Sequence, residues 1–217
     1  GEEVANVLTH GAGMLFGMTA IIVLMMAAIR SGNPWAIGSF AVYAVCMALS
    51  YVTSTFYHAS THARQKRLLR RFDHGAIYLH IAGTYTPFTL LALRQEGYWG
   101  WSLFAVIWIA AVIGVWLSFR KMRKKDHLKT VCYLAMGWVV IIAFKPLLHV
   151  FRETGSMNVL YWLIGGGLFY TVGCLFFFLD KYKYMHPVWH FFVLGGSICH
   201  FISIYSVSYT HLRAHET

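Results

Sequence analysis

Runs of about 20 apolar residues recur along the whole chain, separated by short polar segments, and each run is long enough to cross a hydrocarbon core as an α-helix. The runs are continuous and do not alternate with period two, which excludes a closed transmembrane barrel. Charged residues make up only 12% of the chain, about half the share found in soluble domains. We therefore expect an all-α, polytopic membrane protein.

The apolar runs predict seven transmembrane helices joined by short loops. Together they form one membrane domain over residues 1–207, and we interpret the polar residues 208–217 as a tail whose native origin stays open. Lys145 and Pro146 are expected to interrupt the fifth span near its outer end. The expected spans are 7–29, 36–58, 74–93, 98–119, 130–150, 157–179 and 187–207.

The distribution of lysine and arginine predicts how the spans are oriented. The loops on one side of the predicted bundle hold thirteen basic residues and those on the other side hold only Arg30, Arg94 and Arg152, so the positive-inside rule places the N-terminus in the cytoplasm and the C-terminus outside. Because these basic residues flank apolar runs, we expect no nucleic-acid partner despite the formal net charge of +10. The thirteen are Arg64, Lys66, Arg67, Arg70, Arg71, Arg120, Lys121, Arg123, Lys124, Lys125, Lys129, Lys181 and Lys183.

Polar residues of three predicted spans gather at the cytoplasmic end. Ser54 and His58 lie four residues apart and so share one face of the second span. Asp73 opens the third span, and His186 and His190 open the seventh with the same four-residue spacing. Because polar groups inside lipid are costly, five of them at one depth indicate a functional site.

Three imidazoles beside a carboxylate suit a zinc ion that keeps one coordination position for water. We predict His58, His186 and His190 as ligands, Asp73 and Ser54 as catalytic residues, and Glu3 and His10 as candidates for contacting the ligands from outside. Pro187 is expected to hold His186 at the helix N-cap. The alternative is that each histidine is an interfacial side chain with a hydrated tip.

Four segments resemble the haemolysin III family, the bacterial relatives of the progestin and adipoQ receptors. They are EEVANVLTHGAG from Glu2, STFYHAS from Ser54, LRRFDHGAIYLHIAGTYTPF from Leu69 and HPVWHFFVLGGSICHF from His186. The resemblance implies seven helices, a zinc site on the same three histidines, and a bacterial inner membrane location. It also implies kinship with alkaline ceramidases, which hydrolyse lipid amides.

Three functions remain open at this stage, and the membrane lipid is the expected substrate or ligand in the first two. The leading hypothesis is a hydrolase of lipid amide or ester bonds that uses zinc-activated water. The alternative is a receptor-like sensor or regulator of membrane lipid homeostasis that zinc stabilises. A pore-forming cytolysin has the least support, because short loops between spans offer no secreted form.

Overall fold

The computed structural model describes residues 1–120 and 127–213, and within them the chain is helical with no strand. The predicted all-α fold is confirmed. The elements are α1 Glu2–Ser31, α2 Pro34–Ala59, α3 Ala63–Pro87, the π-helical segment η1 Phe88–Ala92, α4 Trp99–Phe119, α5 His127–Trp138, the 3-10 segment η2 Val139–Ala143, α6 Phe144–Glu153, α7 Met157–Phe178 and α8 Met185–Arg213.

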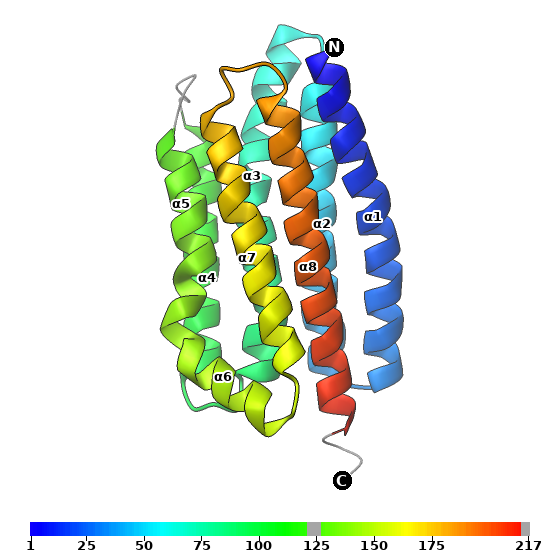
Figure 1. Ribbon diagram of the computed structural model, residues 1–217, viewed down its shortest axis with the longest axis vertical. Helices are drawn as coiled ribbons and strands as arrows, with labels where there is room; N and C mark the ends of the chain where they lie inside the picture. Colours follow the sequence, from blue (N-terminus) through cyan, green and yellow to red (C-terminus); the bar gives the residue numbers. More distant parts are fainter. Residues whose placement is uncertain (121–126, 214–217) are drawn as a thin grey trace.

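The helices form one upright bundle, with the start of α1 and the end of α8 at opposite ends (Figure 1). Among the described residues, six helices are long and apolar enough to cross a membrane: Glu2–Ser31, Pro34–Ala59, Trp99–Phe119, Leu128–Glu153, Met157–Phe178 and Met185–Ser208. The element formed by α3 and η1 runs beside them as the seventh, and its residues 75–92 contain no Asp, Glu, Lys or Arg. Which end faces the cytoplasm stays a prediction from the lysines and arginines.

The outer surface of the bundle is apolar, as a surface in contact with lipid must be. Large side chains such as Ile22, Val112 and Leu175 are more than half exposed on α1, α4 and α7. A soluble protein rarely shows so many exposed aliphatic residues in contiguous patches. The exposed surface therefore agrees with the membrane assignment made from sequence.

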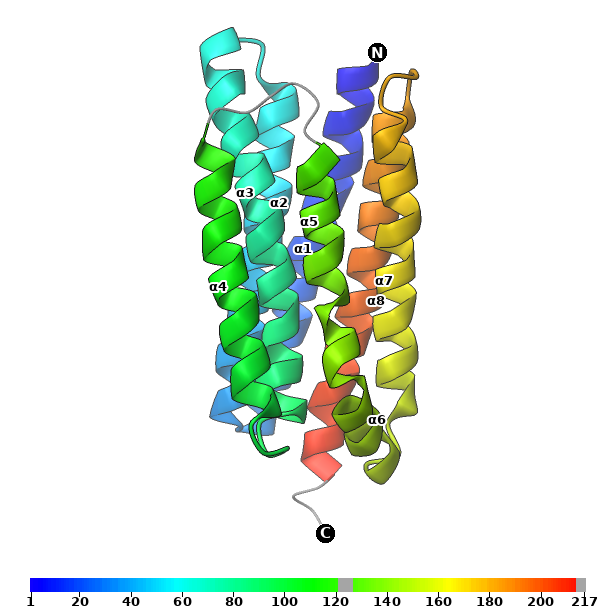
Figure 2. The ribbon, with the colours of Figure 1, turned by 90° about the vertical axis from the view of Figure 1, so that its left-hand side faces the viewer.

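Neighbouring helices surround the interior in an order that brings distant segments together. The helix α1 packs against both α2 and α8, α3 packs against α2 and α4, and α7 packs against α8 (Figure 2). The start of α1, the end of α2, the start of α3 and the start of α8 consequently meet at the end of the bundle that carries the N-terminus.

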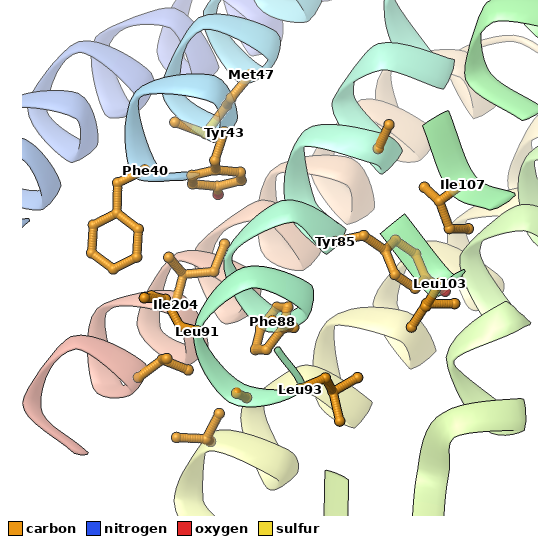
Figure 3. Close-up of a cluster of buried hydrophobic side chains, with 14 of the residues drawn as sticks. Phe40, Tyr43, Met47, Tyr85, Phe88, Leu91, Leu93, Leu103, Ile107 and Ile204 are labelled. Carbon is orange, nitrogen blue, oxygen red and sulfur yellow. The ribbon is translucent and has the colours of Figure 1, made fainter. Parts of the chain in front are cut away.

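An apolar core lies in the opposite half of the bundle (Figure 3). Its side chains come from the first half of α2, the end of α3 with η1, α4 and the last turns of α8, and most of them are almost fully buried. The side chains labelled there are Phe40, Tyr43, Met47, Tyr85, Phe88, Leu91, Leu93, Leu103, Ile107 and Ile204. This division leaves the N-terminal end of the bundle for polar residues.

Several helix ends differ from the expected spans. The helix α3 begins at Ala63, eleven residues before the predicted start at 74, because residues 64–71 are arginine, lysine, glutamine and leucine, all good helix formers. Asp73 is therefore inside a helix and does not open one. The helix α8 begins at Met185, so His186 is its second residue and not its N-cap, and Pro187 occupies the first turn, where its missing N–H is not needed.

The two terminal helices are also longer than expected. The helix α1 begins at Glu2 instead of residue 7, which adds Glu3 and Asn6 to a helical face. The helix α8 continues to Arg213, past the predicted end at 207, so the first part of the predicted tail is helical. Residues 214–217 lie outside the described part of the chain.

The fifth span is broken earlier than Lys145 and Pro146 suggested, because the 3-10 segment η2 starts at Val139. Pro146 has no N–H for the carbonyl four residues earlier, and the helix tightens ahead of it. The Tyr85 hydroxyl accepts a hydrogen bond of 2.8 Å from the Val140 N–H and donates to the Gly137 carbonyl at 2.7 Å. Such pairing is needed, because lipid cannot satisfy freed backbone groups.

Candidate metal site

The structure brings His58, His186 and His190 together from two helices. One ligand nitrogen of each ring can be chosen so that all three lie within 4.8 Å of one another. The ring centroid of His58 lies 5.2 Å from that of His186 and 5.1 Å from that of His190. The centroids of the two α8 rings, His186 and His190, are 4.5 Å apart. The spacing of four residues puts both α8 rings on one face, and α2 supplies the third.

Two of the three histidines are oriented through their Nδ1 atoms. The Nδ1 atom of His58 lies 2.7 Å from Oε2 of Glu3, whose other oxygen accepts a hydrogen bond of 2.5 Å from Lys66 Nζ. The Nδ1 atom of His190 lies 3.1 Å from the Thr9 hydroxyl. With Nδ1 engaged, Nε2 is the nitrogen left for another partner, an arrangement common around metal-binding histidines.

The donor set fits a metal ion. His58 is 6% exposed, and its Nε2 atom is buried and lacks a hydrogen-bond partner within the protein. Buried polar atoms are rarely left unpaired. Here the unpaired nitrogen belongs to a group of three imidazoles, which are borderline ligands preferred by zinc and similar transition metals.

Asp73 and Ser54 lie beside this group without belonging to it. The Asp73 carboxyl on α3 forms a side-chain hydrogen bond with the Ser54 hydroxyl on α2, and both residues line the same cavity as the three histidines. Ser54 is 4% exposed and Asp73 is half-buried. Arg70, one turn before Asp73, also lines the cavity and interacts electrostatically with that carboxyl. The structure thus supplies a carboxyl and a hydroxyl at the edge of the histidine group.

Residues of α1 contribute more than the sequence indicated. His10 packs edge-on against His190 with ring centroids 3.8 Å apart and stacks at 6.1 Å from His58, so it contacts the histidine group directly. Thr9 and Lys66 were not predicted as partners of the site. A signal did exist for α1, since Glu3, Asn6 and His10 recur at helical spacing in a segment rich in polar residues.

A cavity of about 780 Å³ extends from this site into the bundle. The charged residues that line it all lie toward the N-terminal end of the bundle; they are Glu2, Glu3, Arg70, Asp73, Lys129 and Asp180. Its further part is lined mainly by apolar side chains, among them Phe88, Leu103, Leu147, Leu160 and Leu163. A volume of this size with one polar end suits a molecule with a polar group and a hydrocarbon chain.

Comparisons with known proteins agree over nearly the full chain. The sequence model described as "Haemolysin-III related" matches residues 1–201. Hemolysin-3 of Bacillus cereus is 42% identical over 203 residues, which cover 94% of this chain and 90% of that protein. A Hemolysin-3 homolog of Bacillus subtilis is 40% identical over 203 residues, which cover 94% of this chain and 92% of that protein. A human monocyte to macrophage differentiation factor is 27% identical over 214 residues, 96% of this chain and 85% of the human protein. Each match includes the helices that carry the histidines.

Proposed function

The chain belongs to the haemolysin III family, and from that premise we propose that it is a membrane-embedded, metal-dependent hydrolase of amide or ester bonds in lipids. The observation that carries the proposal is the juxtaposition of three imidazoles, the Asp73 carboxyl and the Ser54 hydroxyl at the polar end of a largely apolar cavity. Bacterial relatives support a bacterial inner membrane location. The basic loops favour a site on the cytoplasmic side.

His58, His186 and His190 would hold the metal ion, and zinc is the ion that three neutral imidazoles without a thiolate suit best. When bound, zinc supplies Lewis-acid polarisation of a carbonyl and a more acidic water. Glu3 fixes the His58 ring and Thr9 fixes the His190 ring through their Nδ1 atoms, so both rings keep Nε2 directed away from those partners.

Asp73 is the group that moves the proton. Its carboxylate accepts a proton from water and returns it to the leaving nitrogen or oxygen. Ser54, whose hydroxyl donates to Asp73, holds this carboxylate in place. The carboxyl and hydroxyl come from different helices, so the reaction requires α2 and α3 to stay packed at this end.

The apolar part of the cavity would hold the hydrocarbon chain of the lipid. Side chains of several elements line it, including Phe88 of η1, Leu103 of α4 and Leu147 of α6. Enclosure by these residues excludes bulk water, which strengthens the electrostatic interactions at the polar end. A lipid can place its carbonyl group near the histidines at the polar end and its hydrocarbon chain against the apolar side chains at the same time.

The test is elemental analysis of detergent-purified protein followed by mass spectrometry of ceramides and other lipid amides and esters incubated with it. We expect about one zinc per chain in the parent. Asp73→Asn and Ser54→Ala should keep the zinc and lose turnover, and His58→Ala should lose both. His149→Ala, whose exposed side chain lies on α6, is the control and should behave as the parent. Folded, zinc-loaded protein that cleaves no lipid in the panel would refute the hydrolase.

A zinc-stabilised sensor or regulator of membrane lipid homeostasis is the second candidate. It is favoured by the fact that the histidine group joins α2 to α8, two helices far apart in sequence, while Glu3 and Thr9 add α1. A metal at such a point couples folding to metal binding. A large loss of thermal stability on chelation, without turnover of any lipid, would support this candidate over the hydrolase.

A further inference from the structure

A second layer of polar side chains lies two helical turns deeper in the bundle than the candidate metal site. On each of three helices, a residue of the site has a polar partner seven positions further into the bundle. Seven residues are almost two turns, so the partners share a face and lie about 10 Å apart along the axis. The pairs are His58 and Tyr51 on α2, Asp73 and His80 on α3, and His190 and Ser197 on α8.

Hydrogen bonds join part of this layer across the bundle. The Tyr51 hydroxyl donates to Ser197 Oγ at 2.9 Å, and the Tyr170 hydroxyl of α7 lies at the same distance from the same oxygen. His200, one turn further along α8, places Nε2 3.2 Å from the Leu163 carbonyl. We use the name deep polar layer for Tyr51, His80, Tyr170, Ser197 and His200.

His80 lacks the hydrogen bonding that its neighbours have. It is 7% exposed and lines the cavity, and its Nε2 atom is buried with no partner in the protein. The Tyr43 hydroxyl, fully buried with its ring 6.3 Å from that of His80, is also unpartnered. Unpaired polar atoms are especially costly within a membrane. A partner for His80, which lines the cavity, is therefore expected to come from whatever fills the cavity.

Glycines make room for the rings of the deep polar layer. A Cβ atom added at Gly13, Gly166 or Gly196 would overlap the rings of Tyr51, His200 and Tyr170, respectively. These rings therefore sit directly against the backbone of the neighbouring helix. The layer is part of the packing of α1, α2, α7 and α8, and its polar atoms hold fixed positions.

We propose that the side of the deep polar layer that lines the cavity, formed by His80, Tyr170 and His200, is a second subsite, which binds a hydroxyl group carried on the hydrocarbon chain of a lipid. The charged lining residues all lie at the other end, so the layer offers only neutral donors and acceptors and selects an uncharged group. The separation of about 10 Å from the histidine group corresponds to roughly eight carbon–carbon bonds of an extended chain. The inference rests on the lipid cavity of the proposed function and does not require turnover.

Binding of C18 fatty acids to the purified full chain tests this subsite. Octadecanoic acid is compared with its 2-hydroxy, 10-hydroxy and 17-hydroxy derivatives by titration calorimetry in detergent. One additional buried hydrogen bond predicts that the 10-hydroxy acid binds about 3- to 10-fold more tightly than the other three. Equal affinities, or no binding of any of these acids to folded protein, would overturn the proposal.

Two variants assign the preference to the layer. Tyr170→Phe keeps the ring against Gly196 and removes only the hydroxyl, and His80→Leu removes the unpartnered nitrogen. Each should retain binding of octadecanoic acid and lose most of the preference for the 10-hydroxy acid. Tyr57→Phe removes a hydroxyl from the cavity lining outside the layer and should keep the preference. A preference that persists in both Tyr170→Phe and His80→Leu would also overturn the proposal.

The outcomes separate this inference from the hydrolase. Binding is measured without turnover, so the preference should persist in Asp73→Asn, which is expected to be inactive. A protein that prefers the mid-chain hydroxyl and cleaves no lipid would keep the subsite and refute the hydrolase. A protein that cleaves lipids but binds all four acids equally would support the hydrolase and refute the subsite.

Discussion

Oε2 of Glu3, in the first turn of α1, lies 2.7 Å from Nδ1 of His58, in the last turn of α2. The two residues are separated by almost the whole length of two membrane helices in sequence. Their contact fixes the orientation of an imidazole whose other nitrogen has no partner in the protein. The first turn of α1 is thereby part of the candidate metal site.

Removal of this carboxylate should weaken metal binding. We expect Glu3→Ala to lower zinc affinity about 10- to 100-fold, because outer partners of ligating histidines contribute to ligand orientation and basicity. Glu3→Gln can still accept a hydrogen bond and should lose less. Competition with a chromophoric chelator measures both, and Glu153→Ala, an exposed change on α6, serves as the control. Parent-like affinity in Glu3→Ala would contradict the assigned role.

Chelation should destabilise the parent protein. If zinc at about 1,000 times its dissociation constant stabilises the fold by about 4 kcal/mol, then its removal lowers the Tm by roughly 10 °C in a chain of this size. The measurement is thermal unfolding in detergent with and without chelator. The His190→Ala variant should show almost no change, since it lacks one of the three imidazoles. A similar shift in parent and variant would indicate an effect unrelated to this site.

Loss of the Tyr85 hydroxyl should destabilise the fifth span. In Tyr85→Phe the Val140 N–H and the Gly137 carbonyl lose their partner in the membrane interior, and we expect a loss of about 1–3 kcal/mol in unfolding free energy. Denaturation in mixed detergent micelles measures it. Tyr98→Phe changes a hydroxyl on a side chain that is 73% exposed and should be neutral. Equal stability of the two variants would argue against the bridging role.

Two adjacent glycines of α7 should respond differently to alanine. A Cβ at Gly166 overlaps the His200 ring, whereas a Cβ at Gly165 meets nothing within 4 Å. We therefore expect Gly166→Ala to lower stability by about 1–3 kcal/mol through forced repacking. Gly165→Ala should be neutral or slightly stabilising, because alanine favours the helix. Thermal unfolding of the pair is the measurement, and equal behaviour would contradict the packing described here.

Hydropathy was sufficient to predict the all-α fold, because each span must satisfy its own backbone in lipid. The i, i+4 spacing of His186 and His190 and the matching depth of His58 were enough to predict the group that the structure assembles. Helix ends were less predictable, since the basic segment 64–71 has high helix propensity and is not apolar. The partners Thr9 and Lys66 depend on how α1 packs against α8 and α2, which no local pattern specifies.

The hydrogen bonds of Tyr85 have a mechanical consequence for the fifth span. A single phenol oxygen holds the end of α5, at Gly137, and the start of η2, at Val140, to the third span. The fastened point lies at the break, so α5 and α6 can tilt separately about it while the same oxygen keeps the Gly137 carbonyl and the Val140 N–H paired.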